Sequence, residues 1–416
     1  MALRVILIGA TGIFGSRIAR RLAGDPRFAL VLASRQRQAL EALRAELDNA
    51  SVEVTTLDVT GVDLPVALAQ LAPQLVIHTA GPFQGQDYLV AEACLACGSD
   101  YIDLADGRDF VSGIGRLNDR AHEAGRLLVS GASSVPALSS AVVDALLPRF
   151  RTLQSIEHAI NPGNRTPRGD ATVASILGYC GRSIRVWRDG RWQRAHGWMS
   201  GRRQSFPFGR RRVGLCEVPD LELFPARYPH VHTVLFRAGL ELPLLQGGTW
   251  CAAWLVRLGL ILDLAKHAPR LRRFSELFLR FGSDTGGMVV ELTGIGIDGA
   301  PLRLRWWLDA AAGDGPQVPV TPAVVLAQRL ADGLIAAKGA QPCMDLLTLD
   351  QLVAGFAGYA LRTGLEMLDW AGSVQETCGV SGVRQATLLA PPEQSIAMPR
   401  DPAIRRVAQK FRYGTQ

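Results

Sequence analysis

Residues 4–23, RVILIGATGIFGSRIARRLA, place a short apolar run, three glycines and an amphipathic segment in direct succession. The nearly continuous apolar run at 4–8 is typical of a parallel strand that is buried on both faces. Phe14, Ile18 and Leu22 recur at helical spacing and predict a helix over residues 13–23. The chain is therefore expected to begin with a strand, a glycine-rich turn and a helix.

The same alternation repeats through the first 150 residues. Further strands are predicted at 29–33, 52–57, 75–79, 100–104 and 127–130. Further helices are predicted at 37–47, 62–71, 85–97 and 112–124. Strand–helix units of this length connect through right-handed crossovers and build a doubly wound parallel sheet. The expected fold class is α/β, with an N-terminal domain of the Rossmann type.

In this setting the glycine loop predicts a dinucleotide site, because it follows a strand and opens a helix. Gly9 permits a sharp turn, Gly12 lets backbone N–H groups approach a pyrophosphate, and Gly15 lets the helix pack closely. The phosphates would lie at the positive end of the helix dipole. The rest of the expected cofactor-binding loop consists of Ala10, Thr11, Ile13 and Phe14. The alternative is a glycine-rich turn that binds nothing.

The end of the second strand favours NADP(H) over NAD(H). An NAD site usually carries an acidic residue there, which binds the ribose hydroxyls. This chain has Ser34 and Arg35, and no carboxylate between Asp25 and Glu41. A hydroxyl and a guanidinium suit a 2′-phosphate, and so does the G-x-x-G-x-x-G spacing of the loop. Alternatively, Arg35 simply begins a solvated helix.

The third and fourth strands supply further candidate cofactor contacts. Asp58 and Val59 follow the third strand, where they could meet the adenine, although Asp58 could equally cap the next helix. The turn after the fourth strand is expected to line the nicotinamide ribose, and it consists of Thr79, Ala80, Gly81, Pro82 and Phe83.

Two aspartates are the candidate catalytic groups. Asp103 and Asp106 leave the carboxyl end of the fifth strand, where ligands bind in open α/β sheets. A tyrosine–lysine pair or a Schiff-base lysine is excluded from this domain, because no lysine precedes Lys266. We expect no metal, since no second pair of cysteines completes a zinc site with Cys94 and Cys97.

The chain has 416 residues, which is more than a single core usually holds. We expect an NADP-binding domain at 1–150, an α+β substrate or dimerisation domain at 151–350, and a C-terminal helix and extended tail at 351–416. Asp298-Gly299 lies between two β-rich runs and predicts a hairpin in a largely antiparallel second sheet. Arg303 and Arg305 lie on one face of its second strand and could face either the cleft or water.

The segments HTAGPFQGQDYLVAEACLACGSDYIDLADGRDF and VSGASSVPALSSAVVDAL resemble the saccharopine dehydrogenase-like family, as do GSDTGGMVVELTG and GDGPQVPVTPAVVLAQRLADG further along the chain. The resemblance implies an NADP-binding Rossmann domain and a second domain that closes over the cofactor. It also implies action on C–N bonds of amino-acid adducts, or reduction of enoyl lipids in trans. The positions that match the family motifs are Gly9, Thr11, Gly12, Gly15, Ser34, Arg35, Gly81, Pro82, Phe83 and Asp103.

Three functions remain open at this point. The first is an NADP(H)-dependent oxidoreductase that transfers a hydride to or from a small C=N or C=O substrate. The second is a trans-acting enoyl reductase of lipid or polyketide synthesis. The third is a non-catalytic dinucleotide-binding protein associated with lipid. Hydrophobic cleft walls would favour the enoyl reductase, whereas a cluster of converging arginines would favour an amino-acid adduct.

The net charge of +7 favours anionic partners, but no recognised nucleic-acid motif accompanies it. The segments GRRQSFPFGRRRV (201–213) and TWCAAWLVRLGLILDL (249–264) could contact an acyl carrier or a membrane surface, while the first could also be a solvated loop. The second is too short and too charged to span a bilayer. The first apolar run leads directly into the glycine loop, and the seven cysteines are scattered, so we expect no secretory signal and a cytoplasmic protein. We also expect a homodimer.

Overall fold

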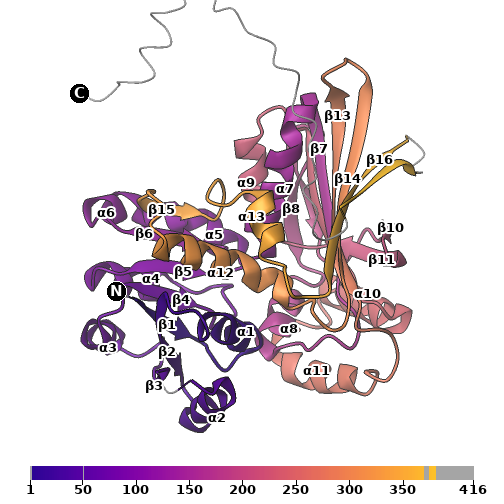
Figure 1. Ribbon diagram of the computed structural model, residues 1–416. Helices are drawn as coiled ribbons and strands as arrows, with labels where there is room; N and C mark the ends of the chain where they lie inside the picture. The colour runs from indigo at the N-terminus through magenta and orange to yellow at the C-terminus, as the bar shows by residue number, and fades with distance from the viewer. Residues whose placement is uncertain (1, 50, 370–373, 381–416) are drawn as a thin grey trace, which may run out of the picture. The chain divides into compact units, whose positions relative to one another are not determined.

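The computed structural model of the chain describes residues 2–49, 51–369 and 374–380 (Figure 1). These residues form two β-sheets. Sheet A has seven strands, all parallel, in the order β15-β6-β5-β4-β1-β2-β3. Sheet B has ten strands and is mostly antiparallel. The predicted fold class is confirmed in both parts.

The first six strands of sheet A correspond to the six predicted strands. They are β1 (Leu3–Ile8), β2 (Phe28–Ser34), β3 (Glu53–Thr56), β4 (Leu75–His78), β5 (Asp100–Asp103) and β6 (Leu127–Ser130). The helices of this part are α1 (Ile13–Leu22), α2 (Arg37–Leu47), α3 (Leu64–Leu71), α4 (Leu89–Ala96), α5 (Arg108–Gly113), α6 (Asn118–Glu123) and α7 (Ser139–Leu146). The helix predicted over 112–124 is interrupted by a 3-10 turn, η1 (Ile114–Leu117), between α5 and α6.

Alternate residues of β1 enter two different cores. Val5 and Leu7 belong to the main core, while Ile6 and Ile8 belong to the core on the other face of sheet A. All four are at most 1% exposed, which confirms that the strand is buried on both faces. The seventh strand, β15 (Gly339–Pro342), pairs with β6 and comes from residues that the sequence analysis assigned to the second domain.

Sheet B contains the predicted hairpin. Its strands are β7 (Phe150–Asn161), β8 (Ser183–Arg188), β9 (Arg191–His196), β10 (Arg202–Phe206), β11 (Gly209–Leu215), β12 (Thr233–Ala238), β13 (Gly286–Gly296), β14 (Pro301–Ala310), β16 (Leu361–Leu368) and β17 (Val374–Val380). β13 and β14 pair antiparallel on either side of Asp298-Gly299, and Gly299 has a φ of +83°. That left-handed conformation is the one that a tight hairpin turn requires of glycine.

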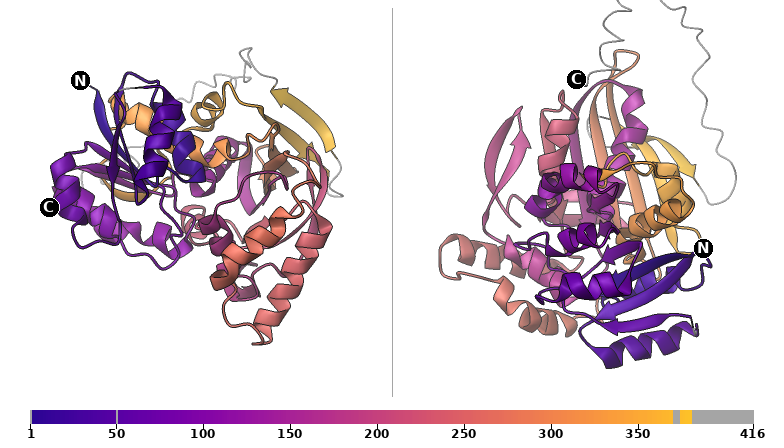
Figure 2. Two further views of the ribbon diagram at one scale, coloured as in Figure 1. Left: turned by 90° about the horizontal axis from the view of Figure 1, so that it is seen from below. Right: turned by 90° about the vertical axis from the view of Figure 1, so that its left-hand side faces the viewer.

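Helices pack between the two sheets and around sheet B. They are α8 (Asp170–Gly178), α9 (Asp220–Arg227), α10 (Pro243–Arg257), α11 (Ala268–Glu276), α12 (Gln317–Ala331) and α13 (Leu349–Ala354), with short turns η2 (Ser134–Leu138), η3 (Leu147–Arg149) and η4 (Ala265–His267). α7 packs on β7 and β13, and α12 packs on α1, so these two helices join the sheets into one core (Figures 1 and 2).

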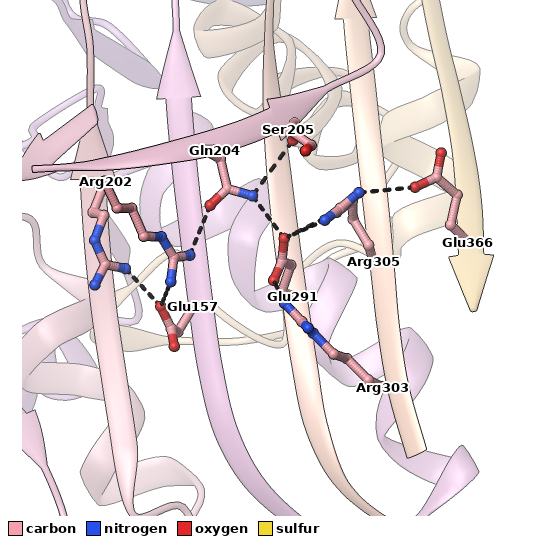
Figure 3. A network of polar contacts seen from close by, with 9 residues as sticks. Glu157, Arg202, Gln204, Ser205, Glu291, Arg303, Arg305 and Glu366 are labelled. Atoms are coloured by element: carbon pink, nitrogen blue, oxygen red, sulfur yellow. Dashed lines mark hydrogen bonds and ion pairs between the residues drawn. The ribbon is translucent and has the colours of Figure 1, made fainter. Parts of the chain in front are cut away.

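The two faces of sheet B differ in chemistry. On β13, Met288, Val290 and Leu292 point into the main core, whereas Glu291 lies on the opposite face. On that outer face the strand β10 crosses over the sheet, and Gln204 donates to Glu291 Oε1 at 2.7 Å (Figure 3). The period of two along each strand therefore separates an inner face that belongs to the main core from an outer face with an ionic network and a small apolar cluster around Val289.

The outer face answers the question that the sequence left open for Arg303 and Arg305. Both donate to Glu291, at 2.8 and 2.9 Å, and Arg305 also donates to Glu366 at 3.2 Å (Figure 3). Arg202, in the arginine-rich hairpin of β10 and β11, forms an ion pair with Glu157 at 2.8 Å. These arginines face a network of carboxylates, and they do not line a cleft between the sheets.

We predicted a C-terminal helix and an extended tail over 351–416. Residues 351–354 belong to α13, whereas β16 pairs with β14 and β17 pairs with β16, so these two strands form an edge of sheet B. Residues 381–416, which include most of the predicted tail, lie outside the described residues.

Candidate active site

The glycine loop between β1 and α1 is tightly packed against the end of β4. Gly9 has a φ of +77°, and a Cβ there would lie 2.7 Å from Thr79 Oγ1 and 2.9 Å from the nitrogen of Ala80. A Cβ on Gly15 would lie 2.2 Å from the carbonyl oxygen of Gly9. Both positions therefore require glycine, as the sequence predicted.

The N-terminus of α1 has the features of an anion site. Gly12 is its N-cap and offers no capping side chain, and the first turn contains no acidic residue. The first N–H groups of a helix have no partner within the helix, and the dipole makes that end positive. Thr11 and Gly12 are exposed, Ala10 is buried in the core, and Ile13 and Phe14 line a cavity described below.

Ser34 and Arg35 lie at the end of β2, next to the third strand. Ser34 is in register with Thr56 of β3, and Arg35 is exposed. Asp58 accepts hydrogen bonds from the backbone and the hydroxyl of Thr60, at 3.0 and 2.8 Å. These bonds, with a smaller contribution from Arg35, lower the pKa of Asp58. Asp58 thus caps the turn that follows β3, while Val59 packs against the core beside it, and their contact with adenine stays a prediction.

The turn after β4 lies beside the glycine loop, but its five residues have different surroundings. Thr79 Oγ1 lies 2.8 Å from the carbonyl oxygen of Ile8, so it ties β4 to the loop. Ala80 and Gly81 are partly exposed, and Pro82 is exposed. Phe83 is buried against His78 and Phe110, with ring centroids 5.1 and 5.3 Å away. A packing role explains Phe83 better than the cofactor contact that we predicted.

A cavity of about 310 Å³ lies where the carboxyl edge of sheet A meets the inner face of sheet B. Its volume is within the range of small-molecule sites. Sheet A contributes the start of α1 and the ends of β5 and β6, including Ser133 and Ser134. The opposite wall comes from sheet B, the loop 162–169 and α8, and most of it is apolar. It includes Ile160, Ile176, Phe236, Met288 and Leu308, and Val318 of α12 also lines the cavity.

Asp106 lines this cavity. Its carboxylate accepts hydrogen bonds from Gln84 at 3.1 Å and from Ser175 of α8 at 2.9 Å. Burial raises the pKa of Asp106 above its ordinary value, although both hydrogen bonds oppose the shift. A carboxyl group with a raised pKa that faces a cavity is a candidate general acid.

Asp103 has a different position. It is fully buried and does not line the cavity. One carboxylate oxygen accepts hydrogen bonds from Ser130 and from the backbone of Ala105 and Gly131, all within 3.0 Å. Burial raises the pKa of the Asp103 carboxyl to about 6. Its contacts fasten the end of β5 to the end of β6, so the geometry favours Asp106 over Asp103 as a group that meets substrate.

Four residues with polar groups line the cavity but were not predicted as site residues from the sequence. Arg168 lies in the loop 162–169, while Tyr179, Trp198 and Glu217 come from three separate segments around sheet B. Burial lowers the pKa of Arg168, and it raises the pKa of Glu217 despite the guanidinium of Arg108 at 3.4 Å. Only the tertiary fold brings these residues together.

The residues at the edge of sheet A fit an NADP(H) molecule. The glycine loop leaves space that a Cβ would fill, the helix end presents N–H groups, and the end of β2 carries a hydroxyl and a guanidinium with no carboxylate between Asp25 and Glu41. Among the residues that the structure describes, no group of three His, Cys, Asp or Glu could hold a metal ion.

Comparison with known proteins agrees with this site. Residues 5–129 match the family model of the saccharopine dehydrogenase NADP binding domain. A probable mitochondrial saccharopine dehydrogenase-like oxidoreductase of Arabidopsis thaliana is 31% identical over 150 residues, which are 32% of each chain. A putative trans-acting enoyl reductase of Mycobacterium tuberculosis is 33% identical over 141 residues, which are 32% of this chain and 33% of the relative. The chain thus matches about a third of the length of these relatives.

The fold of the second part is also found in a solved structure. Saccharopine dehydrogenase (L-Glu forming) from Saccharomyces cerevisiae aligns with 88% of this chain and 100% of its own, with a TM-score of 0.62 and 14% sequence identity. At that identity the likeness shows the fold alone. Residues 5–129 therefore match the NADP-binding domain of saccharopine dehydrogenases, and the fold of the chain resembles that of the yeast enzyme.

Proposed function

We propose that the protein is an NADP(H)-dependent reductase of an apolar substrate with a conjugated C=C bond, such as an enoyl thioester. The observation that carries this proposal is the composition of the cavity. Its sheet B wall is formed mainly by Ile160, Phe236, Met288 and Leu308, and Arg168 is the arginine that lines it. Apolar walls favour a ligand with apolar surface, because contact with them removes that surface from water.

The glycine loop would bind the diphosphate of NADP(H), and Ser34 and Arg35 would bind its 2′-phosphate. When bound, NADPH supplies a hydride, and reduction of the C=C bond takes up that hydride and one proton while NADPH becomes NADP⁺. The position of Ile13 and Phe14, which belong to the loop and also line the cavity, supports a substrate site next to the cofactor.

We assign the proton to Asp106. Ser175 and Gln84 fix its carboxyl group at the cavity wall, and burial keeps its pKa above the ordinary value. The protonated form is the competent one, so kcat should fall as the pH rises through the pKa of Asp106. Asp103 would act only by holding the ends of β5 and β6.

A dehydrogenase of amino-acid adducts is the alternative, and it shares the cofactor and the hydride. Such a substrate carries several carboxylates, which need cationic partners when they leave water. The cavity offers one arginine, and the carboxyl groups of Asp106 and Glu217 supply no positive charge to pair with the additional carboxylates. The relative from Mycobacterium tuberculosis, named as a putative trans-acting enoyl reductase, adds support for the enoyl substrate. Contact with an acyl carrier and the homodimer stay predictions.

The test is NADPH oxidation by the purified chain with two sets of acceptors. One set contains trans-2-enoyl N-acetylcysteamine thioesters of increasing chain length, and the other contains imines formed from amino acids and 2-oxo acids. We expect oxidation with the enoyl thioesters and a KM that falls with chain length. Oxidation with the imines alone would contradict the enoyl assignment. Tight NADPH binding without oxidation by either set would favour the non-catalytic binding protein.

A further inference from the structure

The segment from α10 to the end of α11 exposes an unusual number of large apolar side chains. Seventeen large hydrophobic residues are exposed among the described residues, and twelve of them lie between 244 and 281. We call these twelve the α10–α11 surface, and they are Leu244, Trp250, Trp254, Leu255, Leu258, Leu260, Leu262, Leu271, Phe274, Leu277, Leu279 and Phe281. Apolar patches of this extent on a folded protein mark an interaction site.

The spacing of these residues places them in stripes. Trp250, Trp254 and Leu258 follow one another at four-residue intervals from α10 into the residue after it, and the two indole rings lie 6.2 Å apart. Leu260 and Leu262 protrude from the connection between the helices, with exposed fractions of 70% and 85%. Figures 1 and 2 show α10 and α11 near each other at one edge of the fold.

The same segment carries an excess of unpaired positive charge. It contains six basic and two acidic residues, and both acids already have partners: Asp263 lies near Lys266, and Glu276 pairs with Arg272. Among the described residues, no carboxylate forms an ion pair with the other four, all of which are exposed: Arg257, Arg270, Arg273 and Arg280. The guanidinium groups of Arg257 and Arg280 lie over Trp254 and Phe281.

We propose that the α10–α11 surface binds the surface of a bilayer that contains anionic phospholipid. Exposed leucines, tryptophans at the boundary and unpaired arginines are the combination that suits the interface, where apolar groups enter the acyl region and cations meet phosphates. The helices lie on such a surface. Neither α10, with 15 residues, nor any other helix in the described part is long and apolar enough to cross a membrane.

Charge argues against a second copy of the chain as the partner. In a symmetric dimer the same patch faces itself. That arrangement would bring Arg270, Arg273 and Arg280 against the identical arginines of the other copy, with no free carboxylate in the patch to balance them. A homodimer, if it forms, is expected to use another face.

The surface is linked to the cavity through α8. This helix packs against α11, and Asp170 at its start pairs with Arg272. Thr172 and Ile176 of the same helix line the cavity. One helix, α8, thus contacts both the cavity and the segment proposed to touch the bilayer. The binding proposal itself does not depend on the reductase activity.

Vesicle flotation of the full chain tests the proposal. The vesicles contain phosphatidylcholine alone or phosphatidylcholine with about 30% phosphatidylglycerol, an anionic lipid. Two variants probe the surface: L258D/L260D/L262D removes apolar contacts, and R270Q/R273Q/R280Q removes cations. Their matched controls are V62D/V66D, which changes exposed valines elsewhere, and R203Q/R210Q/R212Q, which removes three exposed arginines from the β10–β11 hairpin.

We expect binding to the anionic vesicles that weakens at high salt, and at least about a tenfold loss of partitioning in both surface variants. The two controls should bind like the unchanged chain. Sedimentation should give the same oligomeric state for all five proteins. No flotation with anionic vesicles, equal loss in the controls, or a dimer that only the surface variants dissociate would overturn the proposal.

Discussion

The two walls of the cavity are built from different parts of the polypeptide: one from segments at the ends of strands, the other from side chains along strands. The wall from sheet A comes from the start of α1 and from the segments after β5 and β6, and it adjoins the glycine loop of Gly9, Gly12 and Gly15, where Cβ atoms are absent. The wall from sheet B consists of side chains along the strands, such as Phe236, Met288 and Leu308. Backbone geometry recognises a group common to many ligands, such as a diphosphate, whereas side-chain shape and polarity select among substrates. Changes in the first wall should thus affect the cofactor, and changes in the second should affect the substrate.

The largest effect is expected at Gly15. In G15A the new Cβ would lie 2.2 Å from the carbonyl oxygen of Gly9, so the loop must move away from α1. We expect a loss of roughly 2–4 kcal/mol in the free energy of unfolding and no measurable NADPH binding. Thermal unfolding measures the loss of stability, and fluorescence titration measures NADPH binding. G24A is the control, because a Cβ there meets nothing within 4 Å. Normal NADPH binding by G15A would contradict the assignment of the glycine loop to the cofactor site.

The next largest effect separates the two aspartates. D106N keeps the shape of the side chain but cannot supply the proton, so kcat should fall by about 10²–10⁴ while NADPH affinity stays unchanged. D109N is the control, since Asp109 is exposed in α5 and carries the same charge. Steady-state kinetics with the best acceptor gives the result. Unchanged kcat in D106N would remove Asp106 from the chemistry.

Asp103 should act through stability. Burial raises its pKa to about 6, so the folded state binds a proton more tightly than the unfolded chain, in which the pKa is about 4. Its contribution to stability is therefore full below pH 4 and is lost as the pH rises through about 6. A shift of about two pKa units corresponds to roughly 3 kcal/mol.

Urea unfolding from pH 4 to pH 7 measures that contribution as a difference. The free energy of unfolding of the unchanged chain should decline relative to that of D103N across this range, because asparagine does not titrate. Parallel curves for the two proteins would show that Asp103 has an ordinary pKa in the fold.

A substitution of Arg35, at the end of β2, tests whether the site prefers NADPH to NADH. R35E should weaken NADPH binding by about tenfold to a hundredfold and leave NADH binding nearly unchanged, since only the 2′-phosphate distinguishes them. Titration with both nucleotides measures the ratio. R44E, a charge reversal further along α2, should change neither affinity. Equal loss of both nucleotides in R35E would refute the 2′-phosphate contact.

The smallest effect is expected on the second wall. Ile176 of α8 is partly buried and lines the cavity, so I176A removes apolar contact with substrate. The KM for a long enoyl thioester should rise by about three- to tenfold, with little change for a short one. NADPH affinity should not move. I297A, at an exposed site on the hairpin turn, controls for the substitution. If only the affinity for NADPH changed, the assignment of Ile176 to the substrate would be wrong.

Local patterns predicted the first wall well. A strand followed by three glycines and a helix predicts a tight turn between the strand and the helix. The short Cβ distances at Gly9 and Gly15 agree with such a turn. The same patterns could not separate Asp103 from Asp106, because Asp103 ends β5 and Asp106 follows only three residues later. Their burial and partners depend on β6 and α8, which come from other parts of the chain.

Sheet B shows more clearly what local sequence patterns cannot predict. Alternation predicted that Arg303 and Arg305 share a face, but which face pointed outward depended on Glu291 and the hairpin of β10 and β11. Likewise, no local signal placed β16 and β17 at the edge of sheet B, since strand pairing over such distances is decided by the assembled sheet.

The sequence by itself determined the parallel sheet and its glycine loop, because these follow from short-range periodicity and from the absence of Cβ atoms at a few positions. It also predicts a preference for a phosphorylated nucleotide, from the absence of a carboxylate after the second strand. Only the tertiary structure decided which acid faces the cavity, that its far wall is apolar, and that the α10–α11 surface remains uncovered among the described residues. Those outcomes depend on contacts between segments that lie tens to hundreds of residues apart, and local patterns carry no information about such distances.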